Sequence, residues 1–328
     1  MHKQLHDDTS AKLPFFMTVD TEGDNLWCKP QVITAHNTEK LERFQILCER
    51  YHIIPVYLTN YEAAASEPFQ HFVKEHREKL EIGFHLHAWN SPPIVPITNN
   101  DHLYQPFLHE YPENQIRNKI DYLYKLLTDT FEQEIVVHRG GRYSVSPFIF
   151  ECLLDCGIHI DCSTTPGISW SRSKGAPFVP EGGNNFKKTS ERIHTIQVGK
   201  REMLEVPIIT LVKNTSISSL DHKHYLRRVY RKFYGNPSCV FRSNLENKAE
   251  LFEIVNDKYK KKMHLQYIIH SSELVKGASY LIKTDSQEKK FYADLESLFQ
   301  HINELGFQSY SFSTYFEAHT SIEKQMAR

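Results

Sequence analysis

The sequence contains no long apolar run and no excess of charge of either sign. No stretch of about 18 consecutive apolar residues occurs in the chain, so no transmembrane helix is predicted. The formal net charge of the 328 residues is -1, from 39 Lys and Arg against 40 Asp and Glu. This balance gives no support for nucleic acid or an anionic membrane as the main partner. It leaves the oligomeric state open.

Cysteines are few, and the first residues are polar. Residues 1–8 lack the apolar core of a secretion signal, so we expect a cytoplasmic protein with reduced thiols. The six cysteines form no dense disulfide framework. Cys152 and Cys156 lie on one predicted helix and Cys162 on the next predicted strand. They are interpreted as buried packing residues, with a structural metal site as the alternative.

The chain also lacks internal repeats, low-complexity tracts and a recognisable linker. Apolar runs alternate with amphipathic segments, which favours an α/β fold with a parallel sheet or barrel. The predicted strands are residues 15–19, 54–58, 81–86, 134–137, 158–161, 203–210, 265–269 and 308–312. The predicted helices are residues 38–51, 68–80, 113–131, 146–156, 222–234, 248–263 and 287–305. We expect one domain over residues 1–328, with its core at about 13–318 and a long loop at about 165–190.

Four short polar segments each close an apolar run. They are Asp20-Thr21-Glu22, His85-Leu86-His87, His138-Arg139 and His270-Ser271-Ser272-Glu273. In parallel α/β folds, ligands and chemistry collect at the carboxyl ends of the strands. We therefore expect these segments to meet at one place, and their side chains are typical of a metal-dependent hydrolytic site.

Two of the segments share a spacing that suits metal binding. Asp20 and Glu22 are two residues apart, as are His85 and His87, so each pair lies on one face of its strand. Two close carboxylates are compatible when a cation holds one of them. One carboxylate with two imidazoles leaves coordination positions open, which is typical of catalytic zinc. The alternative is a capped strand end with solvated acids.

The other two segments supply candidates for positioning and proton transfer. Arg139 precedes the tight Gly140-Gly141 pair and either orients a carboxylate, binds a substrate anion or forms a structural ion pair. His270 is a candidate general acid, or else a buried histidine bonded to backbone.

Further residues have two interpretations, either sugar binding or a structural role. Stacking on a sugar or core packing is expected for Trp89, Trp170, Tyr143 and Phe178. The basic residues 227–232 would contact a phosphate of a carrier-linked sugar, or form a solvated helix face.

Taken together, the segments resemble the motifs of polysaccharide deacetylases of the NodB-homology type, carbohydrate esterase family four and its relatives. Thr18-Val19-Asp20-Thr21-Glu22-Gly23-Asp24 is similar to the first motif, in a form with a spacer between the acids. The second motif usually has its two histidines four residues apart; here that position is Trp89, and His87 is the substitute. The remaining motifs match Arg139-Gly140-Gly141-Arg142-Tyr143, Asp161-Cys162-Ser163, and Leu265 with His270.

The resemblance implies a distorted, incomplete TIM-like (β/α) barrel and a metal-dependent hydrolase. The enzyme would remove an N-acetyl or similar small acyl group from a sugar or polysaccharide precursor, either free or carrier-linked. The His-Leu-His and His-Ser-Ser-Glu-Leu variants look most like bacterial proteins of lipopolysaccharide or capsule biosynthesis. The rival functions are hydrolysis of a non-sugar amide on the same barrel, and carbohydrate binding without catalysis.

It also implies roles for individual residues. Glu22, His85 and His87 would hold a divalent metal, with Zn²⁺ as first choice. Asp20 would be the base, His270 the acid, and Arg139 the partner of Asp20. The supporting residues would be Asp161 or Glu273 against His270, a backbone N–H near Arg142 or Tyr143 against the oxyanion, and Trp89 at the substrate.

Overall fold

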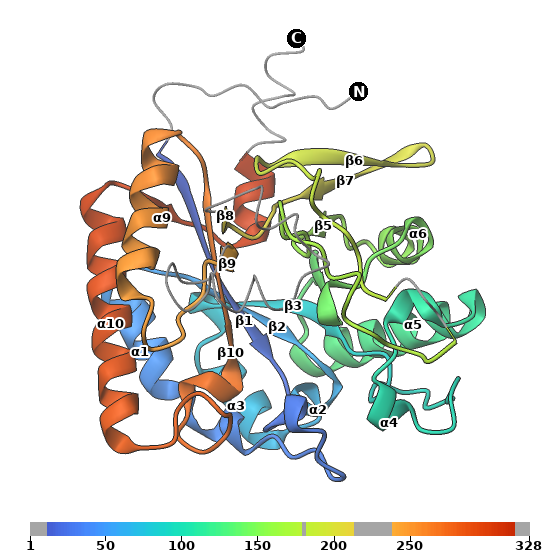
Figure 1. Cartoon of the computed structure of the whole chain (residues 1–328). Helices are drawn as coiled ribbons and strands as arrows, with labels where there is room; N and C mark the ends of the chain where they lie inside the picture. The colour runs from blue at the N-terminus through green and yellow to red at the C-terminus, as the bar shows by residue number, and fades with distance from the viewer. Residues whose placement is uncertain (1–11, 179–181, 213–237, 319–328) are drawn as a thin grey trace, which may run out of the picture.

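The computed structural model describes residues 12–178, 182–212 and 238–318 (Figure 1). Within them, one sheet of nine strands has the order β10-β1-β2-β3-β4-β5-β7-β6, with β11 also paired to β1. Every pairing in it is parallel except that of β6 with β7. Its strands are β1 (Pro14–Thr21), β2 (Pro55–Thr59), β3 (Glu81–Leu86), β4 (Val137–Gly140), β5 (Ile160–Asp161), β6 (His194–Val198), β7 (Arg201–Glu205), β10 (Leu265–His270) and β11 (Gln308–Ser309). A separate antiparallel pair is formed by β8 (Thr210–Val212) and β9 (Ser238–Val240).

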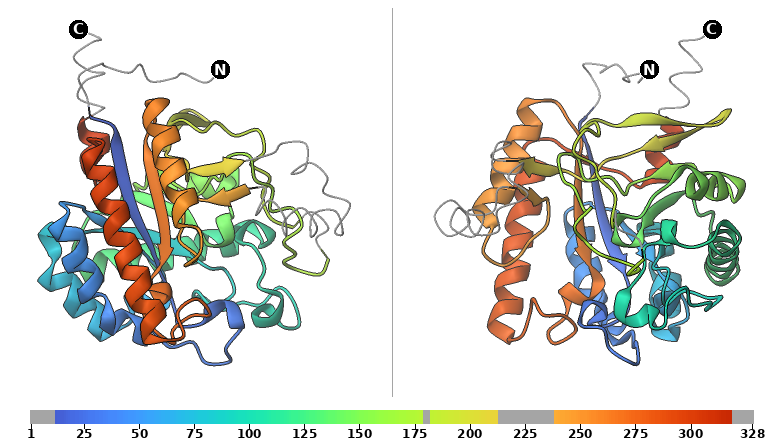
Figure 2. Two further views of the ribbon diagram at one scale, coloured as in Figure 1. Left: turned by 60° about the vertical axis from the view of Figure 1, so that its left-hand side comes forward. Right: turned by 45° about the vertical axis from the view of Figure 1, so that its right-hand side comes forward.

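Helices surround the sheet from outside. In Figures 1 and 2, α1, α9 and α10 lie beside β1 and β10, whereas α5 and α6 lie at the other side of the molecule. The α-helices are α1 (Glu42–Arg50), α2 (Tyr61–Ala64), α3 (Glu67–Glu75), α4 (Asp101–Tyr104), α5 (Glu113–Phe131), α6 (Pro147–Asp155), α9 (Lys248–Lys260) and α10 (Asp285–Glu304). The 3-10 turns are η1 (Leu26–Cys28), η2 (His36–Lys40), η3 (Arg77–Lys79), η4 (Leu108–Glu110), η5 (Gly141–Tyr143) and η6 (Ser271–Leu274). No helix of the described part is long and apolar enough to cross a membrane.

The central strands are buried on both faces, and each face has its own apolar cluster. Outward-facing residues such as Met17, Phe84 and Tyr267 pack with the helices in the larger cluster. Inward-facing residues such as Phe16 and Val137 form a smaller cluster enclosed by the sheet. Because successive side chains alternate between faces, every second residue of a strand points inward. This alternation decides which polar residues at the strand ends can meet.

The sheet curves toward a barrel but its ladder does not close. Single backbone hydrogen bonds cross the opening between β10 and β5. They run from Ile268 N to Phe241 O (3.2 Å), from Phe241 N to Ile209 O (2.8 Å) and from Ile208 N to Thr164 O (2.9 Å). The predicted distorted and incomplete (β/α) barrel is confirmed.

Some element boundaries differ from the prediction. β4 begins at Val137, three residues later than expected, so His138 and Arg139 lie within the strand instead of after it. The prediction of one continuous strand over residues 203–210 is wrong, because β7 ends at Glu205 and β8 begins at Thr210. β7 forms an unpredicted antiparallel hairpin with β6 across Gly199, whose φ is 61°. These edge strands are half-exposed and lack the continuous apolar run of the central strands.

Two predicted segments have no regular element to compare. Residues 165–178 and 182–190 follow an irregular path, with one isolated bridge between Ser169 and Asn185. The predicted helix 222–234, with its basic residues 227–232, lies outside the described residues. The assignment of the whole chain to one domain stays a prediction.

Candidate metal and hydrolytic site

A pocket of about 320 Å³ opens at the carboxyl ends of the central strands. Its lining residues come from segments far apart in the sequence: Asp20, Trp27, His85, His87, Gly140, Arg142, Tyr143, Trp170, Arg242, His270 and Tyr280. The volume is within the range of small-molecule sites. Asp20, His85 and His270 end inward-facing rows on β1, β3 and β10, since their neighbours Val19, Phe84 and Ile269 belong to the outer cluster. The alternation of side chains along these strands therefore brings Asp20, His85 and His270 together at the pocket, as the sequence predicted.

Glu22, His85 and His87 form a buried cluster of potential ligand atoms. Glu22 Oε2 lies 2.9 Å from His87 Nε2 and 3.6 Å from His85 Nε2, and the two imidazole nitrogens are 3.1 Å apart. Ligand atoms at about 2.0–2.1 Å from a tetrahedral zinc ion are separated by roughly 3.3 Å. The three side chains therefore converge on one point with spacings that suit a shared cation.

The charges around Glu22 also favour a cation. Asp20 is paired with Arg139, and Glu273 with Arg242. Among the described residues, the ion-pair contacts of Glu22 are with histidines only, and its side chain is fully buried. A buried carboxylate needs a compensating positive charge. A divalent ion held by Glu22 and the two imidazoles would supply it.

The imidazoles of His85 and His87 differ in their hydrogen bonds and in the direction of their pKa shifts. His85 Nδ1 donates to Arg139 O at 2.8 Å, which leaves Nε2 to face Glu22. Burial disfavours a charged His85, but Asp20 and Glu22 outweigh it and raise its pKa above the usual value. Burial lowers the pKa of His87 to about 4, so its ring is neutral near pH 7 and has a lone pair for a metal. Burial opposes ionisation of Glu22, yet the neighbouring histidines hold its pKa well below normal.

Asp20 lies beside this cluster, and its carboxylate is ionised although it is buried. Its Oδ1 accepts a 2.7 Å hydrogen bond from Arg139 Nη1, and its Oδ2 lies 3.9 Å from His270 Nε2. Burial raises the pKa of Asp20, but Arg139 and the histidines outweigh that effect and lower it. Arg139 is itself fully buried and held by Cys162 O and Gln266 Oε1. The result is an ionised carboxylate with one oxygen available to the pocket.

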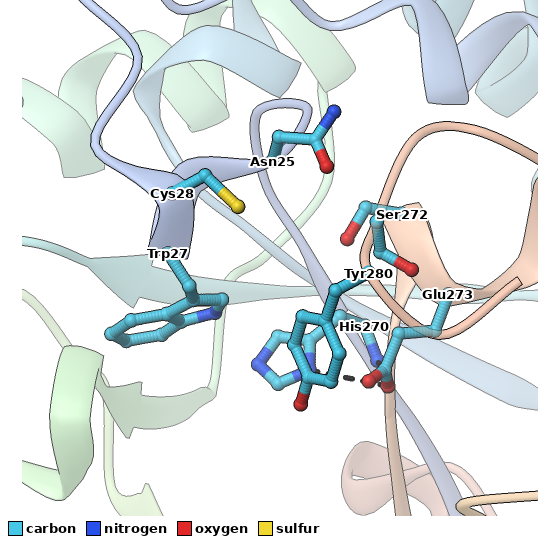
Figure 3. A pocket seen from close by; sticks show the side chains of 8 residues that line it. Asn25, Trp27, Cys28, His270, Ser272, Glu273 and Tyr280 are labelled. Atoms are coloured by element: carbon cyan, nitrogen blue, oxygen red, sulfur yellow. Dashed lines mark hydrogen bonds and ion pairs between the residues drawn. The ribbon is translucent and has the colours of Figure 1, made fainter. Parts of the chain in front are cut away.

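The Nδ1 atom of His270, which faces away from Asp20, contacts the carboxylate of Glu273. His270 Nδ1 lies 3.3 Å from Glu273 Oε2, and Glu273 is clasped by the guanidinium of Arg242. Burial opposes ionisation of Glu273, but Arg242 and His270 lower its pKa to about 2. Figure 3 shows His270 and Glu273 beside a small cavity next to the pocket.

Asp161, the other predicted partner of His270, is not in contact with it. Ile160 belongs to the enclosed cluster, so Asp161 faces the opposite side of the sheet. There it accepts hydrogen bonds from His138 Nδ1 (2.6 Å) and Ser163 Oγ (2.8 Å). The expectation that Asp161 orients His270 is corrected by this geometry.

The turn after β4 contributes a wall of the pocket. Arg142 and Tyr143 adopt positive φ angles of 58° and 60°. The guanidinium of Arg142 donates to the backbone oxygens of Gln105 and Lys174, so it braces neighbouring loops. The Tyr143 ring stacks on Trp170 at 5.0 Å, and both line the pocket.

Two of the aromatic candidates do not line the pocket. Trp89 is buried behind His87, with the two ring centroids 4.6 Å apart. His87 Nδ1 has no hydrogen-bond partner among the described residues, so the imidazole is positioned by its Nε2 contacts with Glu22 and His85 and by packing against the Trp89 ring. Phe178 is exposed and lies outside the lining residues.

The sequence interpretation missed three residues of the site: Trp27, Arg242 and Tyr280. Trp27 and Tyr280 follow no apolar run, and the only hint for Trp27 was its position five residues after Glu22. Arg242 follows the short apolar run Cys239-Val240-Phe241 at the end of β9, which the sequence interpretation did not assign as a strand. The three cysteines considered as metal ligands do not form a ligand cluster in the described part. The other potential group there is Glu42, Glu75 and His76 on the surface.

The sequence matches no protein-family model and no curated protein sequence. Solved structures nevertheless match. A protein from Mycobacterium smegmatis described as a polysaccharide deacetylase superposes with a TM-score of 0.58 at 10% identity, over 97% of this chain and 94% of that one. The present chain shares that fold.

Two other solved structures match with lower TM-scores. The 4-alpha-glucanotransferase from Thermococcus litoralis has a TM-score of 0.47 at 11% identity, over 93% of this chain but 38% of that one. A CE4-family pseudoenzyme from Bacillus anthracis has a TM-score of 0.43 at 10% identity, over 92% of this chain and 65% of that one. Both values lie below 0.5, so the shared fold rests on the mycobacterial structure.

Proposed function

We propose that this protein is a metal-dependent hydrolase that removes an N-acetyl or similar small acyl group from an amino sugar. The observation that supports it most is the contact of Glu22 with His87 and His85 immediately beside the ionised Asp20. The resemblance in motifs and the shared fold agree with a sugar deacetylase. A precursor of a bacterial surface polysaccharide is the substrate class that the motif variants favour.

The three ligands would be Glu22 Oε2, His85 Nε2 and His87 Nε2. When bound, a divalent ion such as Zn²⁺ polarises an amide carbonyl and lowers the pKa of water toward about 7. Three protein ligands leave room for water and substrate. The ligand set has two imidazole nitrogens and one carboxylate oxygen, and imidazole suits Zn²⁺ better than it suits Mg²⁺ or Ca²⁺.

The proton transfers are assigned to Asp20 and His270. Asp20 Oδ2, the oxygen that Arg139 does not occupy, accepts the proton of the attacking water. His270 Nε2 faces the pocket between Asp20 and Glu22 and gives a proton to the leaving amine. Water is consumed, the C–N bond breaks, and a carboxylate and an amine are formed.

The pocket walls support a sugar as the substrate. Tyr143 and Trp170 form a stacked aromatic wall, and Trp27 and Tyr280 add exposed rings. Such rings present an apolar face to a sugar ring and a polar edge to its hydroxyls. A small aliphatic amide would leave most of this surface without contact.

Acetate release with defined metal loading tests the proposal. The chelated protein is expected to be inactive on N-acetylated amino sugars and to regain turnover when Zn²⁺ is restored in equimolar amount. The same preparation assayed on a simple aliphatic amide serves as the comparison. A wild-type protein that binds no divalent ion, or that releases no carboxylate from any acylated sugar offered, would contradict the proposal.

The contact between Glu273 and His270 leads to a separate prediction. Glu273→Gln keeps the size of the side chain but removes the charge that holds the imidazole. We expect kcat to fall by up to about 10²–10⁴-fold, the usual contribution of a positioned general acid, with KM and bound metal unchanged. Steady-state kinetics and metal analysis of the same sample measure this. Glu246→Gln, at an exposed position four residues after Arg242 in the chain, is the matched control, and a wild-type kcat in Glu273→Gln would remove Glu273 from the mechanism.

A further inference from the structure

The two oxygens of the Glu22 carboxylate have different surroundings. Oε2 faces the imidazoles of His87 and His85 at 2.9 and 3.6 Å. Oε1 accepts a 3.1 Å hydrogen bond from the indole Nε1 of Trp27 and lies 3.7 Å from His270 Nε2. One oxygen is therefore free to bind a cation with the histidines, and the other is already engaged.

Trp27 is held in this position by its own short turn. The turn η1 lies between two residues with left-handed backbone, Asn25 (φ 49°) and Lys29 (φ 55°). Asn25 N donates to Ala278 O at 2.8 Å, and Asn25 Nδ2 donates to Gly277 O at 3.2 Å. The turn is thus attached to the loop that follows η6, on the other side of the site.

The indole also packs edge-on against two histidines of the site. Its ring centroid lies 5.4 Å from that of His87 and 6.2 Å from that of His270, with interplanar angles of 76° and 74°. Figure 3 shows Trp27 and His270 on facing sides of the small cavity, with Tyr280 between the viewer and His270. Rotation of the indole away from Glu22 would break both packing contacts.

We propose that Trp27 is a positioning residue that makes Glu22 bind the metal through one oxygen only. This inference rests on the proposed metal site. The indole N–H occupies Oε1, so Oε2 is the oxygen presented to the ion together with the imidazoles. Binding through a single oxygen leaves a coordination position for water or substrate, which a two-oxygen carboxylate would fill. Outer partners of this kind orient ligands and contribute to metal affinity.

The test is Trp27→Phe, which keeps an aromatic ring in the pocket wall and removes the N–H donor. Zn²⁺ affinity is measured by competition with a chromogenic chelator, in the absence of any substrate. We expect the affinity to fall by about 10–100-fold, as for the loss of other outer partners. Trp170→Phe is the matched control, because Trp170 also lines the pocket but its Nε1 donates to Thr165 Oγ1 at 2.8 Å. Its Zn²⁺ affinity should equal that of the wild type.

A second measurement reports the carboxylate itself. In infrared difference spectra recorded on Zn²⁺ addition, the separation of the two carboxylate stretches distinguishes one-oxygen from two-oxygen binding. The wild type is expected to show one-oxygen binding and Trp27→Phe a shift toward two-oxygen binding. Equal affinity and identical spectra in wild type and Trp27→Phe would overturn this inference while leaving the metal site intact. A wild type that binds no Zn²⁺ would overturn both, so the two failures are distinguishable.

Discussion

His85→Ala is expected to purify without bound metal and to release no product above the rate of the chelated wild type. His85 provides one of the three clustered ligand atoms, 3.1 Å from His87 Nε2 and 3.6 Å from Glu22 Oε2. Its removal leaves one carboxylate and one imidazole. The loss of affinity should exceed the roughly 10–100-fold that removal of an outer partner causes. Elemental analysis of the purified variant, alongside its kcat, measures both effects.

A histidine remote from the pocket controls for this substitution. His71 lies on α3 with an exposed side chain, and His71→Ala should keep wild-type metal content and turnover. The assignment of the metal site would fail if His85→Ala turned over substrate without metal.

Asp20→Asn is expected to retain its metal, unlike His85→Ala, but to lose nearly all turnover. The amide cannot accept the proton of the attacking water, so kcat should fall by about 10²–10⁴-fold. Asn keeps an oxygen that can accept the hydrogen bond from Arg139 Nη1. Asp20→Ala is the poorer choice, because an unpaired buried Arg139 would cost about 3–5 kcal/mol of stability. Metal analysis and single-turnover kinetics of Asp20→Asn give the result.

A carboxylate on the exposed side of α5 provides the comparison. Asp129→Asn alters a surface pair with Lys125 and should leave kcat unchanged. If Asp20→Asn lost its metal together with its activity, Asp20 would be a ligand and the base would have to be sought elsewhere. If it kept full turnover, the proposed base would be wrong.

The candidate site could be predicted where its geometry is local to one strand. Asp20, His85 and His270 lie at or next to the last residue of a buried strand, and in parallel sheets the carboxyl ends of the strands lie at one edge. The two-residue spacing of His85 and His87 brings their Nε2 atoms 3.1 Å apart. Those features depend on strand period and parallel pairing, which a pattern of apolar residues reveals.

The residues that were misplaced or missed depend on relations between distant elements. Asp161 follows an apolar run like the others, but its run is shifted by one residue, so its side chain is on the opposite face with His138. The hairpin of β6 and β7 lies at the edge, where alternation is weak and burial is partial. Trp27 and Arg242 reach the site from turns whose paths are set by contacts with other loops.

Local pattern was sufficient for the central parallel strands, the longer helices between them and the presence of metal-binding residue types at strand ends. The reason is that periodicity and side-chain chemistry are properties of short segments. Only the folded chain decided that Glu22 contacts His87 across 65 residues and that Arg139 donates a hydrogen bond to Asp20. It also decided that Glu273, which is paired with Arg242, contacts His270, whereas Asp161 is paired with His138. Those choices depend on strand register and on which face each side chain takes, and a shift of one residue reverses them.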